Sequence, residues 1–299
     1  LRGVIAGETK ISTVGMEGTS LRYRGYDAIK LTETHTYEDA ASLIISDDLD
    51  GSEFTNNFIK YYGELTNDKD INKLFVEIKS RLHPMDVIRT VVSYIGDSDK
   101  NSDLESTTKI LAAVSYVIAS YNDNDTSELD QEYTVASSML SNKVSTDELQ
   151  ALDDILILYA EHGFNASTFA TRVTASTRSD LTSSIVSGIG TLKGELHGGA
   201  NERAVELINS FKDINDAETG VLKMLEEKKK IMGFGHGVYK IQDPRSPVVK
   251  RWVEKLVSDD DAKLRFEIAK KIDEIMDKEK KLFPNVDFYG GLLLSELDF

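Results

Sequence analysis

Residues 229–245 read Lys-Lys-Ile-Met-Gly-Phe-Gly-His-Gly-Val-Tyr-Lys-Ile-Gln-Asp-Pro-Arg. His236 lies between Gly235 and Gly237, with another glycine at Gly233. Such a loop can bend where a side chain would forbid it, and it can bring backbone N–H groups close to a ligand. Between residues 223 and 251, eight basic side chains oppose three acidic ones, a local charge of +5 in a chain whose net charge is −16. A basic, glycine-rich loop with a histidine indicates an anionic ligand and proton chemistry; the alternative is an exposed turn with solvated lysines.

Length and composition narrow the class of protein. A chain of 299 residues can bury a large core and usually divides into two domains. Its hydrophobic content of 40% is ordinary, and no apolar run approaches the roughly 20 residues that cross a bilayer. A sequence without cysteine has no disulfides or thiolate metal sites, and 51 acidic against 35 basic residues argues against binding to nucleic acid or anionic membranes. We expect a soluble, cytoplasmic protein.

The spacing of apolar residues predicts a mainly α fold. The first 31 residues contain short extended patterns and five glycines, which indicate a small β-hairpin or an irregular arm. Beyond them the period is helical. Helices are predicted from Pro84 to Ile95, with Gly96 as a stop, and over 110–121. Another helix follows a capping box of Ser145 and Glu148 and carries an apolar stripe that ends at Tyr159. Two more are predicted over the small residues of 183–192 and along the stripe Leu264, Ile268, Ile272 and Ile275. The polar stretch 122–132 is predicted to be a loop.

Three of the five histidines, His162, His197 and His236, are each followed directly by glycine near a predicted helix end. Asp287, in the segment 284–291, adds a carboxylate. Two chemistries could use this set: a metal site of imidazoles and a carboxylate, or metal-free acid–base catalysis on a carbonyl compound. No H-E-x-x-H or H-x-H pair places two metal ligands on one element, so we favour acid–base chemistry with the basic loop gripping an anionic substrate.

Five segments resemble the motifs of citrate synthases, and they occur in the family's order. They are Leu21-Arg22-Tyr23-Arg24-Gly25-Tyr26-Asp27, Glu161-His162-Gly163-Phe164-Asn165-Ala166-Ser167-Thr168-Phe169, Leu196-His197-Gly198-Gly199-Ala200-Asn201-Glu202, Met232-Gly233-Phe234-Gly235-His236 with Asp243-Pro244-Arg245, and Pro284-Asn285-Val286-Asp287-Phe288-Tyr289. The resemblance covers nearly the whole chain. It implies an acyltransferase that joins acetyl-CoA to oxaloacetate and hydrolyses citryl-CoA to citrate and CoA, the first step of the tricarboxylic acid cycle.

The resemblance also implies roles for single residues. Asp287 would take a proton from the acetyl methyl group, His197 would donate a hydrogen bond to the thioester oxygen, and His236 would donate to the oxaloacetate carbonyl. These three are the predicted catalytic residues. The predicted substrate-binding residues are His162, Arg245 and Asn165, of which Arg245 would hold a substrate carboxylate in a bidentate pair. The predicted CoA-contacting residues are Ile231, Met232, Gly233, Phe234 and Gly235. No metal and no permanently bound cofactor are implied, and the coenzyme A thioester is a substrate.

The implied architecture is the two-domain, mainly helical citrate synthase fold. A large helical domain with an N-terminal arm would cover 1–198, and a small domain carrying the CoA loop, His236 and Asp287 would cover 199–291. Residues 292–299 would begin a return to the large domain. The stripe 264–275 and the run Leu292-Leu293-Leu294 need apolar partners, and we expect a longer polypeptide whose tail supplies them together with two more substrate arginines. The family further implies a homodimer.

The motifs leave several activities open. A 2-methylcitrate synthase, which uses propionyl-CoA, carries the same residues. So does a citryl-CoA lyase running in the opposite direction. A different class of function is that of a non-catalytic homologue that binds CoA or citrate. The presence of His197, His236 and Asp287 together argues against it.

Overall fold

The computed structural model describes residues 6–18, 20–96, 102–121, 134–140, 144–194 and 197–299, which form fifteen α-helices, one short 3-10 helix and three strands. The mainly helical prediction is therefore confirmed. The predicted loop over 122–132 lies outside the described residues, as does Leu196 of the third motif. Within the described ranges, no helix is both long and apolar enough to cross a membrane.

The N-terminal arm is a small antiparallel sheet. Strands β1 (Ser12–Val14), β2 (Leu21–Tyr23) and β3 (Tyr26–Asp27) follow one another in the sheet, with the 3-10 helix η1 (Met16–Gly18) between the first two. The predicted hairpin is the β2–β3 pair, in which Tyr23 opposes Tyr26. Its turn residues Arg24 and Gly25 both have positive φ, 48° and 93°, as a type I′ turn requires. The buried Tyr23 hydroxyl donates to the Ile157 carbonyl at 2.8 Å and fixes the arm to the segment before His162.

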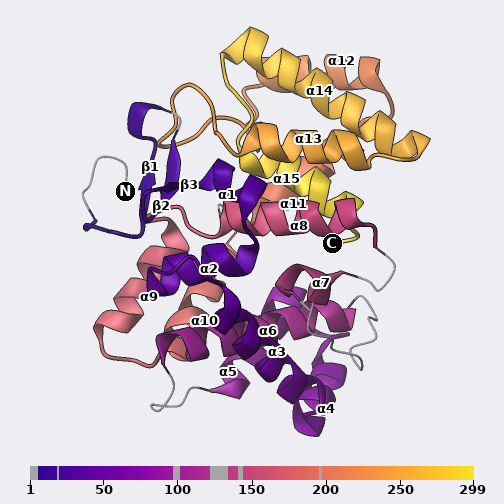
Figure 1. The fold of residues 1–299 in the computed structure, drawn as a ribbon. Helices are drawn as coiled ribbons and strands as arrows, with labels where there is room; N and C mark the ends of the chain where they lie inside the picture. Colours follow the sequence, from indigo (N-terminus) through magenta and orange to yellow (C-terminus); the bar gives the residue numbers. More distant parts are fainter. Residues whose placement is uncertain (1–5, 19, 97–101, 122–133, 141–143, 195–196) are drawn as a thin grey trace.

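The helices fall into two packed groups (Figure 1). The first group contains α1 (Ala28–Thr34), α2 (Tyr37–Ser46), α3 (Ser52–Thr66), α4 (Lys69–Ile78), α5 (Pro84–Ile95), α6 (Asp103–Tyr121), α7 (Val135–Met139), α8 (Thr146–Tyr159), α9 (Ala166–Ser176) and α10 (Leu181–Leu192). The second contains α11 (Gly199–Asn209), α12 (Ile214–Glu226), α13 (Ser246–Leu256), α14 (Asp260–Lys280) and α15 (Val286–Glu296). Helix α8 contacts α13 and joins the groups. The predicted domain boundary at 198 falls between them and stays a prediction.

Several helix ends lie where local sequence signals predicted them. Pro84 is the first residue of α5, where its missing N–H costs nothing, and Gly96 ends the helix with φ 59°. At the start of α8, the Ser145 hydroxyl accepts from the Glu148 N–H at 3.2 Å, while the Glu148 carboxylate accepts from the Ser145 N–H at 2.6 Å. This reciprocal pair is the predicted capping box. In α10, a Cβ at Gly188 would lie 2.4 Å from the Thr171 hydroxyl of α9, which confirms close packing there, although most of α10 is only half-buried.

The apolar side chains of the second group belong to one core that continues into the first group. Ile268, Ile272 and Ile275 of α14 are buried, and Leu264 packs against the same core. Leu292 and Leu293 of α15 are fully buried. The two apolar runs thus find partners among the described helices, because α11 and α13 pack against α15 and α12 packs against α14.

Two buried carboxylic acids join α2 to its neighbours α7 and α8. Glu38 is 2% exposed and accepts from the Val135 N–H at 2.7 Å, and Asp153 is 8% exposed and accepts from the Tyr37 N–H at 3.1 Å. Burial, reinforced by the nearby Glu38, raises the pKa of Asp153 from the ordinary aspartate range to about 7. Folding therefore favours the protonated acid, and stability is lost as the pH rises from the unfolded-state pKa through 7.

We predict that Asp153→Asn stabilises the protein at pH 8 and not near pH 4. The amide keeps an oxygen that can accept from the Tyr37 N–H, and it removes the ionisation that opposes folding. The gain at pH 8 has an upper limit of about 4 kcal/mol, since each pKa unit corresponds to ~1.4 kcal/mol. Urea unfolding at both pH values measures it, with Asp147→Asn, which removes only a partly exposed ion pair with Lys255 in the first turn of α8, as the control. An equal gain at both pH values would contradict the assignment.

Candidate active site

The glycine loop and the segment before α15 are held together as one unit. The Gly235 N–H donates to the Phe283 carbonyl at 2.8 Å, and the Asn285 N–H donates to the Gly233 carbonyl at 2.9 Å. The Asn285 amide nitrogen also donates to the Gly235 carbonyl at 3.0 Å. Gly233 and Gly235 have φ of 83° and 72°, a conformation that glycine adopts without strain. Because the two segments are joined in this way, one unit positions both His236 and Asp287.

A buried ion pair ties the end of the quoted stretch to the same unit. The Arg245 Nε and Nη2 donate to the two oxygens of Asp243 at 2.9 and 2.8 Å. Asp243 Oδ2 also accepts from the Val286 N–H, the first residue of α15, at 3.0 Å. Burial opposes ionisation of Asp243, but the Arg245 guanidinium outweighs it and lowers the pKa of that carboxyl. One edge of the Arg245 fork is therefore engaged by Asp243, which leaves its outer N–H groups for a ligand.

His236 is held as a neutral ring in one tautomer. Its Nδ1 accepts from the Val238 N–H at 3.0 Å and from the Tyr239 N–H at 3.2 Å. Backbone N–H groups can only donate, so the proton of the ring is on Nε2. Burial, with Arg245 and Lys240 acting in the same direction, lowers the pKa of His236. The ring therefore offers an Nε2–H donor at neutral pH.

His162 lies against His236. Their ring centroids are 5.0 Å apart in an edge-to-face arrangement, and the His162 Nε2 hydrogen-bonds the Tyr239 hydroxyl at 3.1 Å. Burial, followed by the Arg245 charge, lowers the pKa of His162 to about 3. This histidine is also neutral at physiological pH. Two neutral imidazoles and the Arg245 cation thus form one side of the site.

His197 is positioned by the start of α9. Its Nε2 accepts from the Ser167 N–H at 3.3 Å and is 2.6 Å from the Ser167 hydroxyl oxygen. With Nε2 accepting from a backbone donor, the proton of the neutral ring is on Nδ1. Asn165 is the N-cap of α9 and accepts from the Thr168 N–H at 2.9 Å. The predicted residue Asn165 therefore fixes the turn that carries Ser167, which in turn holds His197.

Asp287 lies in the first turn of α15, where three helices meet. Its Oδ1 accepts from the Tyr159 hydroxyl of α8 at 3.0 Å. The Asn201 amide of α11, with its nitrogen toward Asp287, donates to the same oxygen at 2.9 Å. Burial raises the pKa of Asp287, and the Tyr159 hydrogen bond and the Arg245 charge limit the increase. A raised pKa is typical of a carboxylate that works as a general base.

Sequence reasoning missed both partners of Asp287. Asn201 is within the quoted third motif, but no role was predicted for it. The helical period predicts Tyr159 in the apolar stripe of α8, but the residue is 38% exposed and its hydroxyl donates to Asp287. Its polar tip at the end of an apolar stripe was the signal that could have indicated this role.

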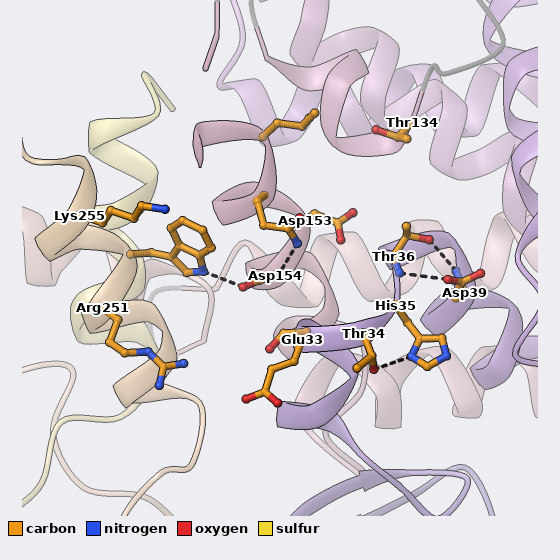
Figure 2. A pocket seen from close by; sticks show the side chains of 14 residues that line it. Glu33, Thr34, His35, Thr36, Asp39, Thr134, Asp153, Asp154, Arg251 and Lys255 are labelled. Carbon is orange, nitrogen blue, oxygen red and sulfur yellow. Dashed lines mark hydrogen bonds between the residues drawn. The ribbon is translucent and has the colours of Figure 1, made fainter. Parts of the chain in front are cut away.

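A cavity between described helices lies elsewhere in the molecule. It measures about 880 Å³, lies between α1–α2 and α8–α13, and includes none of the predicted site residues. In Figure 2, Arg251 and Lys255 lie on one side of it and Glu33, Asp153 and Asp154 on the other. Because both acidic and basic side chains line the cavity, its charge does not indicate whether a ligand would be an anion or a cation. The cluster of histidines, Arg245 and Asp287 is the better candidate because imidazole N–H donors, a cation and a carboxylate converge there in space.

The arrangement suits proton removal next to a carbonyl group. It combines a partly buried carboxylate, imidazoles with defined N–H donors and a buried arginine. In the described part of the chain, no group of three or more histidine, aspartate or glutamate side chains is placed to hold a metal ion. Proton transfer to Asp287 with hydrogen bonds to the developing negative charge is the chemistry that these groups can perform.

Comparison with known proteins places this chain beside a family with such chemistry. A family model described as citrate synthase, C-terminal domain, matches residues 1–299. A 2-methylcitrate synthase of Shewanella oneidensis is 40% identical over 97% of this chain and 81% of its own length. A citrate synthase of Deinococcus radiodurans is 32% identical over 99% of this chain and 84% of its own. The citrate synthase of Thermoplasma acidophilum in ternary complex with carboxymethyl coenzyme A and oxaloacetate has a TM-score of 0.88 and 25% identity, covering 100% of this chain and 84% of that one.

We predict that Gly233→Ala destabilises the fold by about 1–3 kcal/mol, as strained backbone positions do. At φ 83°, a Cβ would lie 2.8 Å from the Phe288 Cβ and 3.0 Å from its Cα, so α15 would have to shift. Gly237→Ala is the matched control: nothing lies within 4 Å of its Cβ, and its effect should stay within about 0.5 kcal/mol. Urea unfolding compares the two. Equal stabilities would show that the loop is not held against α15.

Proposed function

We propose that this acyltransferase, which belongs to the citrate synthase family, condenses an acyl-CoA with oxaloacetate and prefers propionyl-CoA to acetyl-CoA. The family uses coenzyme A thioesters as substrates and holds no bound cofactor. The preference for propionyl-CoA is supported by 40% and 36% identity to two 2-methylcitrate synthases, against 32% to the citrate synthase of Deinococcus radiodurans. Citrate synthesis from acetyl-CoA is the second candidate, because citrate synthases are among the relatives.

The observation that carries the proposal is Asp287 in one cluster with three histidines and Arg245. Asp287 would remove a proton from the carbon next to the thioester. Such a proton is far less acidic than a carboxylic acid, so the developing enolate needs a preorganised donor. The Nδ1–H of His197 would supply it, because Nε2 is engaged by Ser167. Electrostatic interaction with His197 lowers the pKa of Asp287, which supports a role for His197 beside this carboxylate.

The second substrate, oxaloacetate, would be held by His236 and Arg245. The Nε2–H of His236 would donate to the ketone oxygen as the new carbon–carbon bond forms, since Nδ1 already accepts two backbone bonds. The outer N–H groups of Arg245 would hold a carboxylate, because Asp243 occupies its Nε edge. His162 would contribute a further contact beside His236.

Coenzyme A would lie along the loop from Ile231 to Gly235. Ile231 is buried, and the Phe234 ring packs on Phe288 with centroids 4.5 Å apart. These side chains point into the protein, so contacts to CoA would fall to the backbone. The exposed Lys228, Lys229 and Lys230 lie directly before the loop and suit the CoA phosphates.

We expect the protein to release CoA from propionyl-CoA and oxaloacetate, with a kcat/KM about tenfold or more above that for acetyl-CoA. One additional methylene in an apolar pocket is worth ~10–200-fold in discrimination. A thiol reagent follows the released CoA with each acyl-CoA in turn. Citryl-CoA cleavage in the absence of synthesis would instead indicate a lyase.

Asp287→Asn is the control for the chemistry. It should lower kcat by orders of magnitude while calorimetry shows unchanged oxaloacetate affinity, since the lost interaction belongs to the transition state. A higher kcat/KM for acetyl-CoA would favour citrate synthase. A wild-type protein that turns over neither thioester but binds CoA or citrate would be the non-catalytic homologue, and the proposal would be wrong.

We also propose a homodimer with α9 at the subunit interface. Within the described chain, α9 buries none of its residues, although Phe169 and Val173 are apolar and 37% and 52% exposed. Leu192 at the end of the adjacent α10 is 39% exposed. Apolar surface gathered in this way is typical of a subunit contact. Sedimentation equilibrium should show a dimer that Val173→Glu converts to monomer; a monomeric wild type would contradict the proposal.

A further inference from the structure

Tyr159 occupies an unusual position for a large aromatic residue at the end of a helix stripe. It is the last residue of α8, it is 38% exposed, and its hydroxyl donates to Asp287 Oδ1 at 3.0 Å. The two residues are 128 positions apart in sequence, and they belong to the two helix groups. The ring thus contributes less to the core than an inward-facing tyrosine, while its hydroxyl has a specific partner.

Gly290 is the residue that admits this hydroxyl. It lies one turn after Asp287 on the same face of α15. A Cβ at position 290 would lie 2.7 Å from the Tyr159 hydroxyl oxygen, whereas the next atoms, Ile155 Cδ1 and Tyr159 Cε2, are 3.7 Å away. Of these three contacts, only the one with the hydroxyl oxygen is too short for an alanine side chain at position 290. Without the hydroxyl, an alanine side chain would fit.

The two donors to Asp287 act on the same oxygen. Tyr159 and Asn201 reach Oδ1 at 3.0 and 2.9 Å, from α8 and α11 respectively. Among the described residues, no hydrogen bond is made to Oδ2. Two donors on one oxygen fix the rotation of the carboxylate and leave the other oxygen to receive a proton.

We infer that Tyr159 is a positioning residue for the base, and that Gly290 is kept free of a side chain so that the Tyr159 hydroxyl can hold Asp287 with Oδ2 toward the substrate. The inference rests on the proposed function, in which Asp287 is the base. Tyr159 takes up no proton in this role, and its hydroxyl donates to Asp287. Its effect is to orient the carboxylate and to stabilise its ionised form.

Tyr159→Phe should lower kcat by about tenfold to a hundredfold, the size expected when a reacting group is displaced. The KM for oxaloacetate should be unchanged.

Asp287 is faced by Tyr159 from α8, by Arg245 and Asp243 from the loop before α13, and by His197 from the turn before α11. Burial raises the pKa of Asp287 and the Tyr159 hydrogen bond lowers it, so the variant should move the acid limb of kcat/KM to higher pH.

Tyr289→Phe is the matched control. Tyr289 is on the same helix, two residues after Asp287, and its hydroxyl donates to Asp273 at 2.8 Å. It removes a tyrosine–aspartate hydrogen bond of the same kind without touching the base. The variant can lose stability, but its acid limb should coincide with that of the wild type. An unshifted limb in Tyr159→Phe, or an equal shift in both variants, would overturn the inference.

A double-mutant cycle tests the part played by Gly290. Gly290→Ala should lower kcat and shift the acid limb in the wild-type background, although alanine is otherwise the better helix residue. In the Tyr159→Phe background the same change should have little effect, since the atom it displaces is gone. Additive effects would overturn the coupling. If Gly290→Ala fails to fold, the Tyr159→Phe comparison decides alone.

A measurement without turnover separates this inference from the proposed function. Carbon-13 NMR of protein labelled at aspartate carboxyl groups follows the titration of Asp287, identified by the signal lost in Asp287→Asn. In Tyr159→Phe this signal should titrate at higher pH than in the wild type. If the wild type is inactive with both thioesters but the titration shifts, the contact stands and the function is wrong. If the wild type is active and the titration is unchanged, the inference is wrong.

Discussion

The buried pair of Asp243 and Arg245 is the interaction on which the rest of the site depends. Asp243 is fully buried and Arg245 is 5% exposed, so each charge relies on the other for solvation. Removing one partner of such a pair typically costs roughly 3–5 kcal/mol, because an unpaired charge is left in the interior. Asp243 also accepts from the first N–H of α15, which couples Arg245 to the helix that carries Asp287. A single ion pair thus sets the position of two groups with different proposed roles.

Around this pair, hydrogen bonds from backbone N–H groups decide which nitrogen of two histidine rings carries the proton. The Val238 and Tyr239 N–H groups make Nδ1 of His236 the acceptor, and the Ser167 N–H makes Nε2 of His197 the acceptor. The two rings therefore present opposite nitrogens as donors. Burial keeps His162 and His236 neutral, so they can donate a hydrogen bond without bringing a second positive charge next to Arg245.

Glycines at the helix contacts bring Asp287 close to its hydrogen-bond partners. A Cβ at Gly291 would lie 2.6 Å from the Asn201 carbonyl oxygen, and one at Gly290 would meet the Tyr159 hydroxyl. These two adjacent glycines let α11 and α8 approach α15 from different sides. Asp287, one turn earlier on α15, then lies within hydrogen-bonding distance of both neighbours. Side chains at either position would hold the helices apart and leave the carboxylate without its donors.

The sequence alone determined what depends on near neighbours. Pro84, Gly96 and the Ser145–Glu148 capping box define helix ends because caps act over three or four residues, and the helical periodicity indicated the fold class. The ordered motifs identified the family and the histidines. Only the tertiary structure decided that Tyr159 faces Asp287 and that Asp243 takes one edge of the Arg245 fork. It also decided that Asp153 is buried beside Glu38. These features depend on which helices pack together, and a residue's periodicity specifies a face of its helix without specifying what that face meets.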